Sequence, residues 1–459
     1  MVRRAGGRSQ SRFDHPVEEE LLRAEEAAAL LGVKRATLYT YVSRGLVRCV
    51  PEKGTKENRY LRADVERLKT RHDARAGHAA VASGALRWGE PVIDSSVSRI
   101  SEEGLSYRGH DAVELATRGH RFEAVAELLW TGHLSLESTT WPAPEAPWDN
   151  AGSTEPPVRG KRQSASERVA STPRDALLVS PTALAAMLPR DTPPLSALAA
   201  LVPLIAASDA GRFAAPVEQD MLRARRIIRH LGAWVCVAQA PSRVSRALKE
   251  PTVAASLATA WDAKPKRTAE LINLALVLCA DHELNTSTFA ARVTASSGAD
   301  LYACISAALA AISGHRHGGA CDRVEALIAE VGRPERAAQV VHGRLRRGEA
   351  VTGFGHRLYL KGDPRTPPLV AAASSVKPEA PKVRVARAVM DTMRDAGHPP
   401  PSLDWGLVML ADALGLPSGA ATVLFSLGRT AGWVAHVLEQ REQGHLLRPR
   451  ARYVEPPAR

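Results

Sequence analysis

The chain has 459 residues and a formal net charge of +12, and 45% of its residues are hydrophobic. This length allows two to four domains with a large buried core. The sequence has no run of about 18 apolar residues and no apolar segment after its basic N-terminus, so we expect neither a membrane-spanning helix nor a secretory signal. A basic protein can attract nucleic acid, an anionic membrane or anionic substrates, and the composition does not choose among these partners.

The cysteines are scattered through the sequence, and no two of them have Cys-x-x-Cys spacing. They are Cys49, Cys236, Cys279, Cys304 and Cys321. An odd number without paired spacing argues against a metal site and a disulfide framework, and it suits a reducing compartment. We therefore expect a cytoplasmic protein without a bound metal.

Composition also divides the chain into segments. Residues 1–19 are expected to form a polar tail, residues 20–75 a compact unit, and residues 76–90 a linker to a main body at 91–455. Within the body, residues 136–175 are rich in Pro, Ser, Thr, Glu and Arg. Such a stretch cannot bury enough apolar surface to order itself, so we expect a flexible insertion.

The segment after the tail alternates between helix and turn signals. A helix-forming stretch with an apolar stripe starts at Arg23 and ends at Gly32, because glycine accepts the left-handed backbone that closes a helix. A second helix is expected over residues 34–44, in which Leu38 and Val42 would face a core. A helix, a glycine turn and a second helix form the helix-turn-helix layout.

A hairpin-like stretch follows the second helix, with its tip at residues 53–56, and a third helix is expected from Leu61. Residues 23–71 contain 12 lysines and arginines against 6 aspartates and glutamates, a net charge of +6. Half of the formal charge therefore lies in about a tenth of the chain, which favours an anionic partner for this segment.

Short strings in this segment resemble the MerR/excisionase-type winged helix-turn-helix family. They are Ala27-Ala-Ala-Leu-Leu-Gly-Val, Ala36-Thr-Leu-Tyr-Thr-Tyr-Val, Arg59-Tyr and Asp64-Val. The resemblance implies binding to duplex DNA. The candidate DNA contacts lie on the open face of the second helix and at the hairpin: Arg35, Thr37, Tyr39, Thr40, Arg44 and Lys56. The alternative is a folding or oligomerisation cap that contacts protein instead of DNA.

From residue 176 onward the pattern is almost wholly helical, and three short stretches interrupt it with a titratable side chain beside glycine or proline. They are Gly314-His-Arg-His-Gly-Gly-Ala320, Val351-Thr-Gly-Phe-Gly-His-Arg-Leu-Tyr359 and Pro401-Ser-Leu-Asp-Trp405. Breaks between helices let polar groups point into a cleft, and glycine lets the backbone approach a ligand. These stretches are therefore the candidates for a catalytic site.

Two histidines and one aspartate in these breaks, His317, His356 and Asp404, suit the removal of a proton from a weak carbon acid. A carboxylate takes the proton, one donor holds the charge that appears on oxygen, and another donor polarises the receiving carbonyl. Any one of the histidines taken alone is more often a structural residue or a helix cap.

In their order, these stretches resemble the citrate synthase family, together with further matching segments. The further segments are Gly104-Leu-Ser-Tyr-Arg-Gly-His, Ala280-Asp-His-Glu-Leu-Asn and Gly428-Arg-Thr-Ala-Gly-Trp. The resemblance spans roughly residues 91–455. It implies a mainly α fold: an all-helical body with a large domain and a small domain at about 318–420, preceded by the small winged helix-turn-helix domain.

The resemblance also implies a role for each matching residue. Asp404 would remove a proton from the acetyl methyl group, His317 would stabilise the enol or enolate oxygen, and His356 would polarise the oxaloacetate carbonyl. The implied ligands of oxaloacetate are His282, Arg365, Arg429 and Arg448, the last donated by the other subunit of a homodimer or larger homo-oligomer. Guanidinium groups suit this dianion because they bind carboxylates in bidentate pairs. Acetyl-CoA or another acyl-CoA would be the second substrate, with no permanently bound cofactor.

Three positions depart from the family's usual pattern. The family often has Asn where this chain has Cys321 and Ser402, and it usually has Lys or Arg near a coenzyme A phosphate where this chain has Leu360. The departures leave the three reacting groups intact. The changed positions bear on the affinity for coenzyme A and on the choice of acyl group.

The sequence leaves alternative functions open. The first is an enzyme that forms citrate from acetyl-CoA, or 2-methylcitrate if propionyl-CoA is preferred. The second is a metabolite-sensing transcriptional regulator with weak or no turnover, whose body binds ligand while the N-terminal unit binds DNA. The retained reacting groups favour the enzyme, whereas the basic unit and Leu360 favour the regulator.

Overall fold

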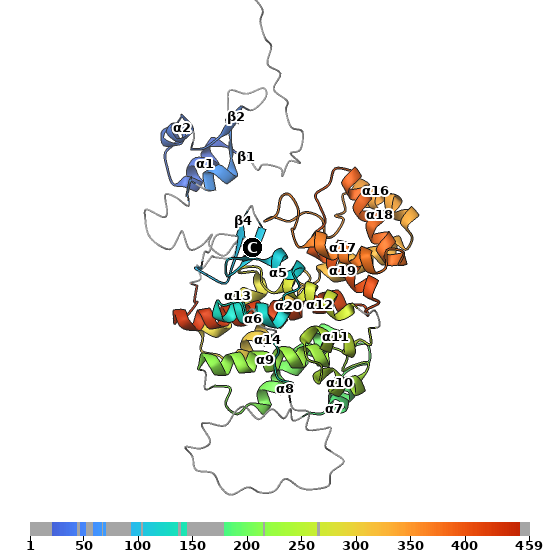
Figure 1. Cartoon of the computed structure of the whole chain (residues 1–459). Helices are drawn as coiled ribbons and strands as arrows, with labels where there is room; N and C mark the ends of the chain where they lie inside the picture. The colour runs from blue at the N-terminus through green and yellow to red at the C-terminus, as the bar shows by residue number, and fades with distance from the viewer. Residues whose placement is uncertain are drawn as a thin grey trace, which may run out of the picture. The chain divides into compact units, whose positions relative to one another are not determined.

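The computed structural model describes most of the chain in two compact units (Figure 1). The described residues are 21–43, 46–51, 58–66, 68–69, 93–101, 104–135, 139–144, 179–213, 216–263 and 267–449. The expected tail and linker, and most of the expected insertion, lie outside them. One unit comprises residues 1–94 with 448–459, and the other comprises residues 95–447. Within the described part of the chain, no helix has the length and apolar character needed to cross a membrane.

The first unit packs short helices against a small antiparallel sheet in the order β1-β3-β2. Its described elements are β1 (Leu21–Leu22), α1 (Ala24–Leu31), α2 (Arg35–Ser43), β2 (Cys49–Pro51) and β3 (Asn58–Leu61). The side chain of Glu26 accepts a hydrogen bond from the backbone N–H of Arg23, which starts α1. Gly32 ends α1 with a φ of +64°, the left-handed conformation expected for it. Leu38 of α2 is fully buried in the core of this unit.

The second unit is almost wholly helical. Its helices are α5 (Ala112–Thr117), α6 (Phe122–Thr131), α7 (Pro181–Met187), α8 (Pro194–Ser208), α9 (Val217–Trp234), α10 (Val244–Leu248), α11 (Val253–Ala260), α12 (Thr268–Cys279), α13 (Thr286–Ser296), α14 (Leu301–Ile312), α15 (Ala320–Val331), α16 (Ala337–Arg346), α17 (Thr366–Val376), α18 (Pro381–Asp395), α19 (Leu403–Leu414) and α20 (Ala420–Gln443), with short 3-10 turns at Pro241–Arg243 and Pro334–Arg336. A small antiparallel sheet precedes them, formed by β4 (Ser98–Ser101), β5 (Gly104–Tyr107) and β6 (His110–Asp111).

Helix α20 lies at the centre of the second unit. It packs against α6, α9, α12, α13 and α14, and also against α15 and α19. Figure 1 shows α16, α17, α18 and α19 gathered in a second group of helices, coloured orange, beside the larger helical layer. The functional side chains discussed below come from α20 and from the segments that lead into α13, α15, α17 and α19, so α20 joins the two groups at this site.

The small sheet is anchored to the last turn of α12 and to the segment that follows it. The hydroxyl of Tyr107, which is fully buried, donates to the carbonyl oxygens of Val277 and Leu278 at 3.1 and 3.2 Å. The hydroxyl of Ser98 donates to the carboxylate of Asp281. These contacts fix the backbone on which His282 is carried.

Candidate active site

His317 lies in the turn between α14 and α15. A Cβ atom at Gly318 would lie 2.1 Å from the carbonyl oxygen of Ile312, so only glycine fits this tight return of the chain. The backbone N–H of Ser287 donates to Nε2 of His317 at 3.3 Å, and the Ser287 hydroxyl lies 2.8 Å from the same nitrogen. Burial, assisted by the charge of Arg429, lowers the pKa of His317 to about 4. The ring is therefore neutral at pH 7, with Nε2 as acceptor and Nδ1–H as the available donor.

His356 lies in the loop between α16 and α17. The backbone N–H of Leu358 donates to Nδ1 of His356 at 3.1 Å. Burial lowers the pKa of His356, although the carboxylates of Asp363 and Asp404 act in the opposite direction. With Nδ1 accepting a hydrogen bond, the neutral ring carries its proton on Nε2 and can donate it to a carbonyl oxygen.

His282 faces His356 across the same part of the unit, with ring centroids 5.6 Å apart. Nε2 of His282 lies 3.0 Å from the hydroxyl of Tyr359, which belongs to the His356 loop. Burial and the positive charges of Arg365 and Arg429 lower the pKa of His282 well below its usual value. His282 is therefore a neutral hydrogen-bonding group.

Two buried arginines supply positive charge beside these histidines. Arg365 forms a bidentate ion pair with Asp363, through contacts of 2.9 and 2.7 Å, while its Nη1 atom is buried without a hydrogen-bond partner among the described residues. Arg429, in the middle of α20, donates from Nε to the carbonyl oxygen of Cys279 at 2.9 Å and lies over the ring of Phe425. Burial and the like charge of Arg365 lower the pKa of Arg429. Two such charges close together suit a dianionic ligand.

Asp404 lies in the first turn of α19, which begins at Leu403. The sequence pattern suggested a break at this point, whereas the structure places the carboxylate at a helix N-terminus, where negative charge is stabilised. Its Oδ2 atom accepts a hydrogen bond from the hydroxyl of Ser402 at 2.8 Å, and its Oδ1 atom accepts one from the thiol of Cys321 at 3.3 Å.

A short backbone pairing links the His356 loop to the start of α19. The backbone N–H of Gly355 donates to the carbonyl of Pro400 at 2.9 Å, and that of Ser402 donates to the carbonyl of Gly353 at 2.8 Å. The structure therefore joins the segments of His356 and Asp404 directly. His282 comes next to them through His356 and Tyr359, and His317 is connected to Arg429 through contacts of both with Phe425.

Two further positions that the sequence analysis singled out are exposed. Arg448 is exposed and belongs to the other compact unit. The side chain of Leu360 is 87% exposed.

The sequence patterns assign no role to Ser287 or to Tyr359, although Tyr359 closes one of the three stretches that interrupt the helical pattern. Ser287 fixes His317, and Trp433 of α20 donates to the Ser287 hydroxyl at 3.1 Å. Tyr359 contacts His282, and the pKa of Tyr359 is raised to about 12, mainly by burial, so its hydroxyl stays protonated. Tyr359 lies three residues after His356 in the sequence, and this spacing could have indicated that it belongs to the site. The contact of Ser287 with His317 could not be inferred from sequence spacing.

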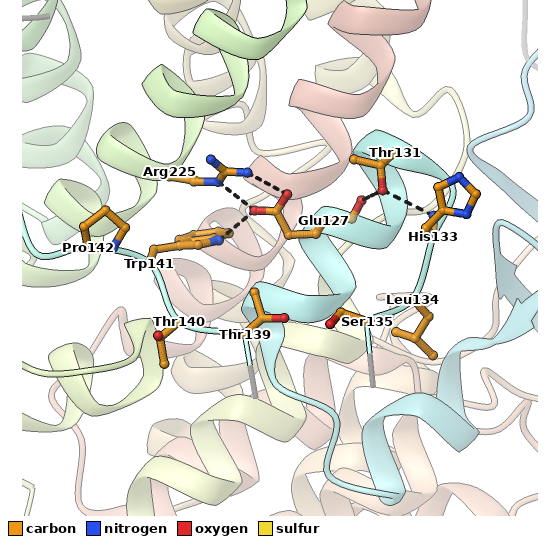
Figure 2. Close-up of a pocket in the computed structure, with 10 residues that line it drawn as sticks. All are labelled: Glu127, Thr131, His133, Leu134, Ser135, Thr139, Thr140, Trp141, Pro142 and Arg225. Atoms are coloured by element: carbon orange, nitrogen blue, oxygen red, sulfur yellow. Dashed lines mark hydrogen bonds and ion pairs between the residues drawn. The ribbon is translucent and has the colours of Figure 1, made fainter. Parts of the chain in front are cut away.

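The described residues contain no group of three or more His, Cys, Asp or Glu side chains arranged to hold a metal ion. A separate cavity of about 420 Å3 lies beside α6 and is lined by ten residues shown in Figure 2. Arg225 pairs with Glu127 at 2.7 Å, and the indole of Trp141 donates to the same carboxylate at 2.8 Å. None of the predicted catalytic or substrate-binding residues lines this cavity.

Leu38 is the buried residue of α2, and the candidate DNA contacts of this helix keep part or most of their surface accessible. Arg35, Tyr39 and Thr40 are exposed, and Thr37 is half-buried. Arg35 forms an exposed ion pair with Glu25 at 3.4 Å, a contact that contributes little to stability. The remaining two candidates lie outside the described residues: Arg44 and Lys56.

Comparison with known families identifies both units. The family model described as "Citrate synthase, C-terminal domain" matches residues 85–450, and the model described as "Helix-turn-helix domain" matches residues 21–73. The chain is 31% identical over 379 residues to a protein named citrate synthase 2 from Bacillus subtilis, covering 80% of this chain and 95% of that one. It is 43% identical over 215 residues to a putative citrate synthase 2 from Mycobacterium tuberculosis, covering 45% of this chain and just over half, 57%, of that relative.

A solved structure gives the same result for the fold. The ternary complex of citrate synthase from Thermoplasma acidophilum with carboxymethyl coenzyme A and oxaloacetate is similar, with a TM-score of 0.63 and 25% sequence identity. The match covers 81% of this chain and 96% of the other. The expected mainly α fold, with a helix-turn-helix domain at the N-terminus, is therefore confirmed.

Proposed function

The chain belongs to the citrate synthase family, and on this premise we propose that it condenses acetyl-CoA with oxaloacetate and hydrolyses the resulting thioester to citrate and CoA. One observation carries the proposal. Backbone N–H groups donate to Nε2 of His317 and to Nδ1 of His356, and burial keeps both rings neutral. Each ring thereby presents its other nitrogen as a donor, which is the state that can hydrogen-bond to an oxygen on which negative charge develops.

The chemistry follows from these donors. Asp404 takes a proton from the methyl group of the acyl-CoA while Nδ1–H of His317 donates to the thioester oxygen. The resulting nucleophilic carbon attacks the carbonyl carbon of oxaloacetate, whose oxygen is polarised by Nε2–H of His356. The new alkoxide takes that proton, and the proton that Asp404 removed from the methyl group replaces it on His356, so that both groups return to their starting states. Water then adds to the citryl thioester, the C–S bond breaks, and the thiol of CoA leaves.

Oxaloacetate would bind through its two carboxylates and its carbonyl. The free Nη1 of Arg365 and the guanidinium of Arg429 provide the positive charge, and neutral His282 provides a hydrogen bond. We assign the remaining contact to Arg448 from the second subunit of a homodimer, because this residue is exposed in the single chain. No permanently bound cofactor enters this scheme.

The loop that follows His356 bears on the choice of acyl group. Leu358 and Leu360 are 41% and 87% exposed on the loop that follows His356, where the family usually presents a cation to coenzyme A. Propionyl-CoA, which would give 2-methylcitrate, is therefore tested beside acetyl-CoA.

The experiment follows release of free thiol by purified full-length protein with oxaloacetate and each acyl-CoA. We expect turnover with at least one of them and a loss of about 100- to 10,000-fold in Asp404→Ala. Binding of oxaloacetate to Asp404→Ala should persist, because the base acts on the other substrate. Absence of turnover with both thioesters would favour the second candidate function, a metabolite-sensing regulator.

DNA binding by the N-terminal unit is the part of the proposal that extends beyond the enzyme. It is supported by the helix-turn-helix match and by the exposed polar face of α2. A cytoplasmic location would give this unit access to duplex DNA.

A further inference from the structure

The carboxylate of Asp404 is held by two side chains that come from different helices. The thiol of Cys321, in the first turn of α15, donates to Oδ1 at 3.3 Å. The hydroxyl of Ser402, just before α19, donates to Oδ2 at 2.8 Å. Each carboxylate oxygen therefore has one donor, which fixes the rotation of the carboxyl group about its own axis.

Ser402 occupies the position at which a serine usually caps a helix. Its backbone has the extended conformation of an N-cap, but its hydroxyl makes no hydrogen bond to the backbone N–H groups of α19. Serine at this position normally satisfies one of those N–H groups. Here the hydroxyl is directed to Asp404 instead, so the helix gives up a stabilising contact in favour of the carboxylate.

Cys321 is suited to remain a donor over the whole working pH range. Only 1% of its surface is exposed. Burial, reinforced by the charge of Asp404, raises the pKa of the Cys321 thiol well above its usual value. The sulfur therefore keeps its proton and points it at a carboxylate, although a thiol is a weaker donor than a hydroxyl or an amide.

Both residues are departures from the citrate synthase pattern, and both donate a hydrogen bond to the carboxylate of Asp404. We infer that Cys321 and Ser402 are a matched pair of positioning residues that hold Asp404 in the orientation of a catalytic base. The inference rests on the proposed function for the identity of the base. On this inference, Cys321 and Ser402 act together on one carboxylate, and they are not two unrelated losses of the family's usual Asn.

The pair has a predictable effect on pH dependence. A donor to the ionised form favours ionisation, so its removal moves the acid limb of the pH–rate profile to higher pH. Among the described residues, the charge of Asp404 also contributes to the raised pKa of Cys279 of α12, and it opposes the lowering of the pKa of His356 in the loop before α17. Neither is changed in the experiment below.

The experiment compares full-length Cys321→Ala, Cys321→Ser and Ser402→Ala with the wild type. Removal of either donor should lower kcat about 10-fold, because the loss of one hydrogen bond to a charged group corresponds to a change in rate of about that factor. The acid limb should also move up by about one pH unit, while KM for oxaloacetate stays within about twofold because its ligands are untouched. Cys321→Ser retains a donor, so its profile should return to the wild-type position or lie at lower pH.

Cys304→Ala is the matched control, because Cys304 is a fully buried thiol in α14 that makes no contact with Asp404. It should lose stability as a small cavity forms but keep the wild-type pH profile. If Cys321→Ala and Ser402→Ala keep the wild-type acid limb, the pair has only a structural role and the inference is overturned.

A second measurement separates this inference from the proposed function. The carboxyl carbon of Asp404 is titrated by NMR in protein labelled with 13C-aspartate, and the signal is assigned with Asp404→Asn. A wild type without thiol release would contradict the proposed function alone. An upward shift of this titration in Cys321→Ala would still support the positioning pair, and an unchanged titration would refute it.

Discussion

Phe354 pairs with Pro401 in an antiparallel bridge, which joins the loop of His356 to the start of the helix that carries Asp404. The pairing brings together segments separated by more than 40 residues of sequence. It sets the distance between the group that would polarise oxaloacetate and the group that would deprotonate the acyl-CoA. Movement of this bridge should therefore affect catalysis more than substrate binding.

The first prediction concerns Gly353, which forms part of the bridge. Gly353 has a φ of +82°, and a Cβ atom there would lie 2.6 Å from Nε1 of Trp405. We expect Gly353→Ala to displace the bridge and to lower kcat by about 10- to 100-fold. Gly348→Ala is the matched control, since Gly348 has a φ of +72° with nothing within 4 Å of its Cβ position. Thiol release and thermal unfolding of both variants check the prediction, and equal loss of kcat in the two would contradict it.

The second prediction concerns His317 as the donor to the developing oxygen charge. Replacement of His317 by Ala should lower kcat by about 100- to 1,000-fold, the usual effect of removing such a donor. Because the pKa of His317 lies near 4, the wild-type ring is neutral from pH 8 down to about pH 5. Protonation of His317 should therefore not limit the rate near pH 6. Rate profiles measured between pH 5 and 8 test this, and an activity loss near pH 6.5 that disappears in His317→Ala would count against it.

The sequence predicted the fold class, and the positions of the candidate catalytic residues at breaks between helices, better than the contacts that hold these residues. Helix signals and glycine breaks placed His317 and His356 between helices, because backbone geometry is encoded locally. The contacts of Ser287 with His317 and of Cys321 with Asp404 join residues 30 and 83 positions apart. Such pairings depend on helix packing, which the periodicity of a single sequence does not specify.

The third prediction concerns stability and a buried histidine outside the site. His230 of α9 is fully buried, and neither ring nitrogen has a hydrogen-bond partner among the described residues. Burial, with the charges of Arg226 and Arg229, lowers its pKa to about 3. The unfolded chain takes up a proton near pH 6.5 while the folded chain does not. The stability contributed by neutral His230 is therefore present above pH 6.5 and is lost as pH falls toward 3.

Replacement of His230 by Leu should remove this acid sensitivity. We expect the variant to be as stable as the wild type at pH 7.5, or more stable by about 1–3 kcal/mol, because an unpaired buried polar group is removed. Below pH 6.5 the wild type should lose about 1.4 kcal/mol per pH unit more than the variant. Urea unfolding at pH 7.5 and 5.5, at one protein concentration, measures both values. His445→Leu serves as the control, because His445 is exposed. If the wild type and His230→Leu lose the same free energy of unfolding between pH 7.5 and 5.5, His230 is not the source of the acid sensitivity.

The fourth prediction concerns a site shared between subunits. If Arg448 completes the site of the other subunit, Asp404→Ala and Arg448→Ala should each be inactive alone. In a hybrid dimer, one site would combine an intact Asp404 with an intact Arg448. Random exchange of equal amounts should then restore about a quarter of wild-type activity. A chain that is monomeric in solution, or the absence of rescue after exchange is confirmed by mass spectrometry, would exclude this arrangement.

The last prediction concerns DNA and the exposed face of α2. Full-length protein should bind duplex genomic fragments at low salt, and the affinity should fall steeply as salt rises because each neutralised phosphate releases counterions. Arg35→Ala should weaken binding and reduce the slope of log affinity against log salt by about 1 if the guanidinium contacts a phosphate. Tyr39→Ala, at a side chain that is 51% exposed, should weaken binding with less change in the slope of log affinity against log salt.

Arg394→Ala is the control, because Arg394 is 71% exposed on α18 of the second unit. Fluorescence anisotropy at about 50 and 150 mM salt makes the comparison. Binding that is absent at low salt, or that is equally insensitive to the α2 variants and to Arg394→Ala, would leave the N-terminal unit as a protein-contact or folding cap.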